Sequence, residues 1–215
     1  MIMPKVTIVD YGIGNLLSVA RAFQYCEAEV EFADSPDAII RADRLVLPGV
    51  GAFSDGMSGL DKKGLSDHIK EYSQTGRPFL GICLGMQMML DVSYEFGKHQ
   101  GLGIIPGKVV PIPSCGIEGR THKIPFIGWN ELLIPDCVTD WEGTIFSGIG
   151  LRSSVYFVHS FEAIPEYERN RLAVYDYNGQ VISAAIRSGN LYGCQFHPEK
   201  SGPVGLKIIR NFINL

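Results

Sequence analysis

Apolar residues in the first 95 positions alternate between short continuous runs and stretches with helical spacing. The continuous runs predict buried strands, and apolar residues three or four positions apart predict helices that bury one face. We expect strands at residues 5–10, 30–32, 44–47 and 79–82. We expect helices at residues 16–23, 35–40, 64–75 and 84–92. This regular alternation predicts an α/β fold with a largely parallel sheet and right-handed crossovers.

The chain changes character after residue 100, where glycine and proline become frequent and strand-like runs follow one another. We expect further strands at residues 108–110, 126–127, 131–133, 155–159, 172–175, 181–186 and 191–196. Several of these runs have the spacing of hairpins, and Asn178-Gly179 is a favoured two-residue hairpin turn. We therefore expect antiparallel strands added to the parallel core, followed by a closing helix at residues 202–215.

The length and composition of the chain fit one globular domain that covers residues 1–215. The net charge is −4 and the basic residues are dispersed, so we expect no nucleic-acid partner. We also expect no membrane association, because no apolar run is long enough to cross a bilayer and the first residues do not resemble a signal peptide. The five cysteines form no C-x-x-C pair, which favours a reducing compartment such as the cytoplasm.

Cys83 stands where the apolar run at residues 79–82 gives way to helical spacing. Gly81 and Gly85 flank it, and glycine tolerates the crowding at a sharp strand-to-helix turn because it has no Cβ. The pattern is that of a G-x-S-x-G nucleophile elbow with cysteine in place of serine. The N-terminal end of the following helix would favour the nucleophilic thiolate. The alternative is a buried structural cysteine beside two packing glycines.

His197 and Glu199 supply the groups that a cysteine nucleophile needs. A thiol requires a base, and the base requires a carboxylate that fixes its tautomer. The two residues lie two positions apart, just after a predicted strand, and Pro198 stiffens the link between them. Taken separately, each is an ordinary surface residue. Together with the elbow at Cys83, they predict a catalytic triad for acyl transfer.

Two glycine-containing loops also follow predicted strands, at the sheet edge where ligands of α/β proteins bind. Residues 10–15 contain a G-x-G without the third glycine of a dinucleotide fingerprint, so we interpret this loop as a wall of the site. Residues 48–53 can direct backbone N–H groups at an anion, as an oxyanion hole requires. For both loops, the alternative is an ordinary connection between a strand and a helix. His159, at the end of a predicted strand, is a further candidate for the site or an interface.

Residues 81–87 (Gly-Ile-Cys-Leu-Gly-Met-Gln), together with His197-Pro198-Glu199, resemble the triad of class I glutamine amidotransferases. Within that group, further blocks resemble the glutaminase subunits of imidazole glycerol phosphate synthases, and they extend over essentially the whole chain. These blocks are residues 10–15 (Asp-Tyr-Gly-Ile-Gly-Asn), 48–53 (Pro-Gly-Val-Gly-Ala-Phe), 128–130 (Gly-Trp-Asn), 156–160 (Tyr-Phe-Val-His-Ser) and 197–201 (His-Pro-Glu-Lys-Ser). The resemblance implies a flavodoxin-like, three-layer α/β sandwich.

The resemblance also implies a role for each matching residue. Cys83 would attack the side-chain amide of L-glutamine and form a thioester, His197 would move the proton, and Glu199 would orient the histidine. The oxyanion hole would use Leu84, Val50 and Gly51. Substrate glutamine would be held by Gly49 and Gln87. The resemblance implies no metal and no cofactor.

The partner implied by the resemblance is a (β/α)₈-barrel cyclase that forms a heterodimer with the glutaminase. The cyclase would receive ammonia through an internal channel and produce imidazole glycerol phosphate and an aminoimidazole carboxamide ribotide, in histidine biosynthesis. The residues expected at the interface, or coupled to it, are Asn15, Trp129, Tyr156, His159 and Lys200.

Two features depart from the family pattern. Phe126 stands where the family commonly has histidine, and the loop at residues 114–123 is longer than expected. Both leave open a paralogous glutaminase that supplies ammonia for amidation of a surface-polysaccharide sugar. The motifs are also compatible with a stand-alone cysteine-dependent γ-glutamyl hydrolase or peptidase, or with a binding module whose elbow is vestigial.

Overall fold

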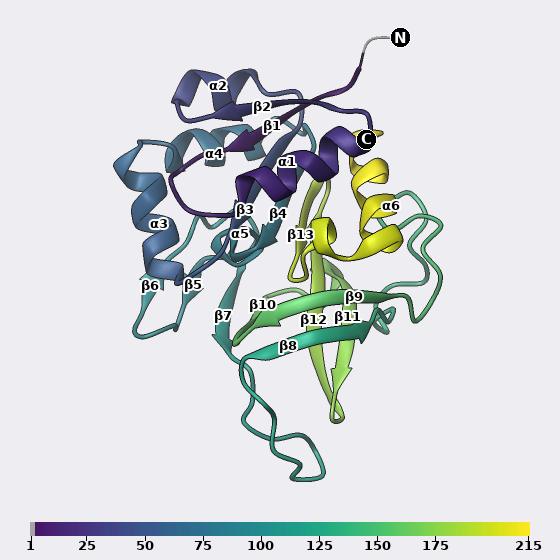
Figure 1. The fold of residues 1–215 in the computed structure, drawn as a ribbon. Helices are drawn as coiled ribbons and strands as arrows, with labels where there is room; N and C mark the ends of the chain where they lie inside the picture. Colours follow the sequence, from purple (N-terminus) through teal and green to yellow (C-terminus); the bar gives the residue numbers. More distant parts are fainter. Residues whose placement is uncertain (1–2) are drawn as a thin grey trace.

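The computed structural model describes residues 3–215. Met1 and Ile2, which begin the segment compared above with a signal peptide, lie outside the described residues. Seven strands form the main sheet, in the order β11-β12-β13-β4-β3-β1-β2 (Figure 1). Five of them are parallel, namely β1 (Lys5–Val9), β2 (Glu29–Ala33), β3 (Leu45–Gly49), β4 (Phe79–Cys83) and β13 (Leu191–Cys194). At one edge, β12 (Gln180–Ser188) pairs antiparallel with β13, and β11 (Arg171–Tyr177) pairs antiparallel with β12. The expected mostly parallel sheet with added antiparallel strands is confirmed.

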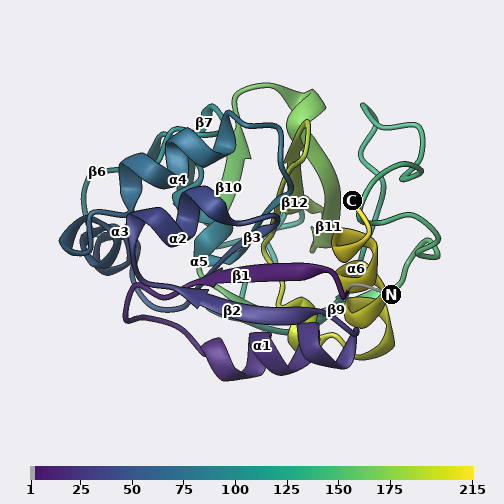
Figure 2. The same cartoon turned by 90° about the horizontal axis from the view of Figure 1, so that it is seen from above.

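Helices cover both faces of this sheet and make three layers, as Figure 2 shows from above. One face packs against α1 (Leu16–Tyr25) and α6 (Gly202–Ile213). The other packs against α2 (Pro36–Arg41), α3 (Phe53–Lys62), α4 (Ser66–Ser73) and α5 (Leu84–Met88). Successive side chains of a strand point to opposite faces. Thus Ile8 of β1 lies in the core under α1, whereas Val9 lies in the core on the opposite face.

Two smaller sheets extend the main one. Four strands have the order β10-β7-β5-β6, and their bounds are β5 (Val92–Ser93), β6 (His99–Gln100), β7 (Gly107–Pro111) and β10 (Phe161–Pro165). The pair β8 (Phe126–Glu131) and β9 (Ser154–His159) lies across β11 and β12 in Figure 1. Two short 3₁₀ helices are η1 (Glu168–Asn170) and η2 (Pro198–Lys200). Between β7 and β8, the segment that contains residues 114–123 projects away from the body (Figure 1).

The expected turn at Asn178-Gly179 joins β11 to β12, and both residues have positive φ, 52° and 85°. These angles are those of a type I′ turn, whose twist matches that of the two strands. The expected strand at residues 131–133 is wrong in part. β8 ends at Glu131, and Leu133 makes only an isolated bridge with Val174.

Two helices differ from the expectation. The helix after Cys83 ends at Met88 instead of continuing to residue 92, because Met89 and Leu90 tighten the last turn and Val92 pairs with β6 and β7. Helix α3 was not expected from the sequence. Glycine lowers helix propensity, and α3 contains two. No helix in residues 3–215 has the length and apolar character needed to span a bilayer.

Candidate active site

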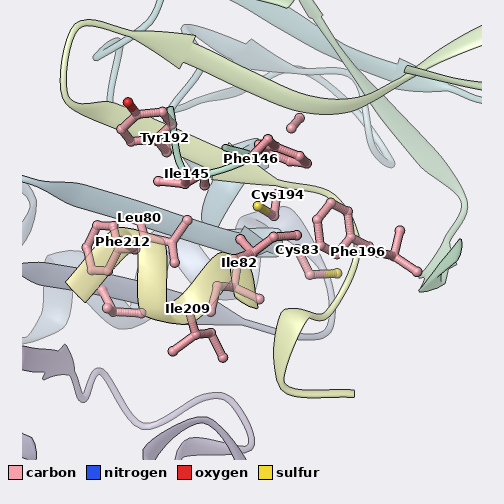
Figure 3. Packing of buried hydrophobic residues seen from close by; sticks show 14 of the residues in the cluster. Leu80, Ile82, Cys83, Ile145, Phe146, Tyr192, Cys194, Phe196, Ile209 and Phe212 are labelled. Carbon is pink, nitrogen blue, oxygen red and sulfur yellow. The ribbon is translucent and has the colours of Figure 1, made fainter. Parts of the chain in front are cut away.

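Cys83 is the last residue of β4 and the N-cap of α5, with φ 54° and ψ −111°. This conformation is strained for a residue with a Cβ, and such strain is concentrated at functional sites. The flanking glycines allow it: a Cβ on Gly85 would overlap the carbonyl oxygen of Leu47, and one on Gly81 would lie 2.8 Å from the backbone N of Met86. The predicted strand-to-helix elbow is therefore present. Its sulfur lies at the border of the apolar core, near Cys194 and Phe196 (Figure 3).

His197 reaches the same edge of the sheet because β13 lies directly beside β4 and runs parallel to it, with Cys194 opposite Ile82. Nδ1 of His197 lies 2.8 Å from Oε1 of Glu199. Both side chains are buried, with 3 % and 2 % of their surface exposed. The backbone around them is held by the hydroxyl of Ser201, which donates to the carbonyl of His197 at 2.7 Å.

The charge environment of His197 is unusual. Burial lowers the pKa of its imidazole, but interactions with Cys83 and Glu199 raise it more. The result is a pKa raised from 6.5 to about 9. Nε2, the nitrogen not bound to Glu199, is buried and has no hydrogen-bond partner among residues 3–215. Nε2 therefore remains free for a proton.

A pocket of about 220 Å³ opens in front of Cys83. The residues expected for the site that line it are Val50, Gly51, Cys83, Leu84, Gln87, His159 and His197. The lining residues that sequence reasoning missed are Glu95, Val158, Ser160 and Phe161. Glu95 is the only carboxylate among them, and one of its oxygens accepts a hydrogen bond from the backbone N of Phe53 at 2.5 Å.

Gly49, expected to hold substrate, does not line this pocket. It lies beneath the elbow, where a Cβ would approach the hydroxyl of Tyr11 at 2.6 Å and Cβ of Leu84 at 2.9 Å. The hydroxyl of Tyr11 donates to the carbonyl of Pro48 at 2.9 Å, so the loop after β1 supports the loop after β3. Gly49 instead borders a small cavity, together with Asn15, Glu199 and Lys200.

The loop after β3 carries the residues expected for the oxyanion hole. Gly51 has φ +98°, in the region that favours glycine, and an added Cβ would meet no atom within 4 Å. Val50, which lines the pocket, is 41 % exposed. A glycine at this position lets the peptide next to Val50 take more than one orientation at modest cost.

The expected interface residues fall into two groups. Trp129 and Tyr156 are cross-strand partners on β8 and β9, with ring centroids 6.0 Å apart, and Trp129 is 55 % exposed. Asn15 and Lys200 are exposed near the small cavity beside Glu199. His159 does not fit a place on the surface, because it is buried: Nδ1 lies 2.8 Å from the carbonyl of Phe161.

Phe126, which stands where the family commonly has histidine, is part of the wall behind His159. Its ring stacks on Tyr175 with centroids 5.4 Å apart and meets His159 edge-on at 6.3 Å. Burial lowers the pKa of His159 to about 4, so its imidazole is neutral at physiological pH. An aromatic hydrocarbon at position 126 suits this dry, uncharged environment.

The family model described as glutamine amidotransferase class-I matches residues 7–215. The chain belongs to this family. It is 59 % identical over 213 residues to the imidazole glycerol phosphate synthase subunit HisH 1 of Legionella pneumophila (strain Lens), across 99 % of this chain and 100 % of that protein. It is 45 % identical over 208 residues to subunit HisH of Syntrophotalea carbinolica, across 96 % of this chain and 98 % of that protein. The molecule is thus an enzyme, a HisH-type glutamine amidotransferase.

Solved structures of more distant proteins share the fold. PurLQS from Thermotoga maritima matches over 99 % of both chains with a TM-score of 0.71 at 19 % identity. The glutaminase domain of CTPS from Trypanosoma brucei matches over 98 % of this chain and 94 % of its own, with a TM-score of 0.64 at 16 % identity. These matches confirm the expected fold class.

Proposed function

We propose that this chain is the glutaminase subunit of an imidazole glycerol phosphate synthase and hydrolyses L-glutamine through Cys83, His197 and Glu199. The observation that carries the proposal is the buried His197–Glu199 pair, 2.8 Å apart, beside the pocket into which the strained Cys83 opens. A strained nucleophile, a base and an orienting carboxylate in one pocket are the parts of a thiol acyl-transfer site. Identity of 59 % to a HisH subunit supports the glutamine substrate.

In the proposed reaction, the Cys83 sulfur attacks the side-chain carbonyl carbon of glutamine, and its proton resides on His197. The oxyanion is stabilised by the backbone N–H of Leu84 and by one from Val50 or Gly51. His197 then gives its proton to the amide nitrogen, ammonia leaves, and a thioester remains. Water, activated by the now neutral His197, attacks the thioester and releases glutamate. Glu199 supports the imidazolium in both halves of the reaction.

Substrate binding uses two side chains of the pocket. Glu95 offers a carboxylate to the α-ammonium group of glutamine. Gln87 offers its side-chain carbonyl, because its NH₂ group already donates to the carbonyl of Phe161 at 3.1 Å and to Gln195 at 3.0 Å. Gly49 acts indirectly, since its missing Cβ lets the elbow and the oxyanion loop approach each other.

The released ammonia passes to a (β/α)₈-barrel cyclase, which binds this subunit as a heterodimer and makes imidazole glycerol phosphate and the carboxamide ribotide. The docking surface includes Trp129 and Tyr156, with Asn15 and Lys200 nearer the triad. The whole chain acts as one amidotransferase domain. The five free cysteines of the part described support a reducing compartment, and we place the enzyme in the cytoplasm.

The proposal is tested by co-expressing the chain with a candidate barrel cyclase and measuring conversion of the ribotide substrate with glutamine as nitrogen source. A stable one-to-one complex with glutamine-dependent formation of imidazole glycerol phosphate is expected. Efficient hydrolysis of γ-glutamyl peptides by the isolated chain, with no gain from the cyclase, would instead favour a stand-alone hydrolase.

The loop at residues 114–123 favours a second candidate for the acceptor of the ammonia. It projects from the body but is anchored at its end, where His122 stacks on Tyr177 with ring centroids 3.9 Å apart and Phe126 packs on the same tyrosine. This loop precedes β8, the strand that carries Trp129, and its length departs from the family pattern. This favours the paralogous role, in which ammonia is used to amidate a surface-polysaccharide sugar. The two roles are distinguished by which barrel protein forms the complex.

A further inference from the structure

Gln195 is a buried polar residue close to the nucleophile, and the reaction described above does not use it. It lies two positions before His197 and has no exposed surface. Its backbone N donates to the carbonyl of Ala184 at 2.9 Å, which ties this residue to β12. Its side-chain Nε2 lies 3.7 Å from Sγ of Cys83, within the range of an N–H···S hydrogen bond.

The orientation of the Gln195 amide follows from a chain of hydrogen bonds that begins at a backbone carbonyl. The carbonyl of Phe161 can only accept, so the atom of Gln87 that lies 3.1 Å from it must be Nε2. The second hydrogen of that nitrogen then points to Gln195 at 3.0 Å, and the Gln195 atom that receives it must be the oxygen. The remaining polar atom of Gln195 is the NH₂ group, and this is the group that faces Sγ.

The carbonyl of Phe161, where this series of hydrogen bonds begins, is itself held in place. It also accepts from Nδ1 of His159 at 2.8 Å, and Nε2 of His159 lies 3.0 Å from the hydroxyl of Tyr175. Because burial keeps His159 neutral, Nδ1 carries the ring proton and Nε2 accepts from Tyr175. The donor and the acceptor are therefore assigned for every hydrogen bond in the series from Tyr175 to Cys83.

We propose that Gln195 is a further catalytic residue of this enzyme, which donates a hydrogen bond from Nε2 to the Cys83 sulfur and stabilises the thiolate before attack and when the thioester breaks. The inference rests on the proposed function, because it assumes that Cys83 is the nucleophile. A hydrogen bond to an anion is stronger than one to a neutral atom, so this donor favours the thiolate over the thiol. A side-chain amide does not act as a general acid or base near neutral pH, so the role of Gln195 differs from that of His197.

The test is the pH dependence of alkylation of Cys83 by iodoacetamide in the isolated full-length chain, with each modified cysteine quantified by mass spectrometry. In Gln195→Met, which keeps the length of the side chain and loses the donor, we expect Cys83 to react about tenfold more slowly below the midpoint of the profile, with the midpoint moved to higher pH. In Gln195→Glu, one carboxylate oxygen still accepts from Gln87 and the other faces the sulfur. The loss should therefore be at least as large.

Two controls separate this effect from a disturbance of packing. The exposed Cys115 of the same molecules should react at the same rate in every variant. Ser183→Ala, a buried polar-to-apolar change in the neighbouring strand, should leave the Cys83 profile unchanged. If Cys83 in the folded Gln195 variants is alkylated with the same pH dependence as in the wild type, the proposal is overturned. If Gln195→Met does not fold, the result for Gln195→Glu decides alone. Failure of a thiol-reactive glutamine analogue to label wild-type Cys83 would instead count against the proposed function.

Discussion

Nδ1 of His197 lies 2.8 Å from Oε1 of Glu199, and the two side chains are almost completely withdrawn from solvent. This contact makes Nδ1 the donor and leaves Nε2 without a partner, as the proposed proton transfer with Cys83 requires. In the proposed mechanism, the histidine carries the proton transfer, whereas the carboxylate orients the ring and balances its charge.

We expect His197→Asn to lower the glutaminase rate of the complex by about 10²–10⁴-fold, because it removes the base and the acid together. Glu199→Gln should cost less, since an amide oxygen can still orient the ring but cannot balance its charge. Steady-state kinetics of ammonia release measure both. Similar losses in the two variants would argue against this division of roles, and an unaffected His197→Asn enzyme would refute the triad.

The raised pKa of His197 predicts how stability depends on pH. Because the folded state holds this proton up to a pKa of about 9, against 6.5 when unfolded, the folded protein binds more protons between these values. The contribution to the free energy of unfolding is therefore complete below pH 6.5 and is lost as the pH rises to about 9. Denaturant unfolding at several pH values should show this decline in the wild type. His197→Gln should lack it, and the same slope in both proteins would contradict the assignment.

Gly85 provides a test of the elbow itself. A Cβ there would overlap the carbonyl oxygen of Leu47, which is backbone of the neighbouring strand and cannot move aside. We expect Gly85→Ala to lower the free energy of unfolding by at least about 1–3 kcal/mol, as overpacking does, and to abolish labelling of Cys83 by a glutamine analogue. Gly150→Ala is the matched control, because its Cβ would meet only Oγ of Ser153 at 3.6 Å. Equal stabilities of the two variants would contradict the crowding at the elbow.

The loop after β3 predicts control by the partner. A free glutaminase would waste glutamine, and the peptide at Val50 and Gly51 can present either an N–H or a carbonyl to the oxyanion. Loss of one oxyanion donor typically costs about 10²–10³ in rate. We therefore expect the isolated chain, with the Val50 N–H turned away from Cys83, to hydrolyse glutamine at least about 10²-fold more slowly than the complex with bound acceptor. Full activity in the isolated chain would contradict this mechanism.

The elbow and the His197–Glu199 pair could be predicted from the sequence because each is a local pattern. Two glycines around a cysteine, between a strand and a helix, define the turn by steric limits alone. A histidine and a glutamate two positions apart after a strand can meet without help from the rest of the fold. The parallel sheet followed from the spacing of apolar residues, and β4 beside β13 then brought the two patterns together.

Other parts depend on contacts between distant segments and carry weaker local signals. Helix α3 was missed because Gly56 and Gly59 lower the helix propensity of this segment. Both glycines are required by packing, since added Cβ atoms there would approach Met88 and Tyr11 closely. Glu95 reaches the pocket only because the chain after α5 turns into β5, and no motif marks it. Gln195 did leave a trace, since it is a polar residue in the predicted strand at residues 191–196, and an extended strand would place it on the same face as His197.

Cys83→Ala in the complex with the barrel cyclase tests the nucleophile most directly. The measurement is the rate of product formation with either glutamine or ammonium chloride as the nitrogen source. In the proposed function the acceptor chemistry lies on the other subunit, so we expect the variant to lose all glutamine-dependent activity and to keep the ammonium-dependent activity of the wild type. Glutamine-dependent turnover in the Cys83→Ala complex would contradict the assignment of Cys83 as the nucleophile.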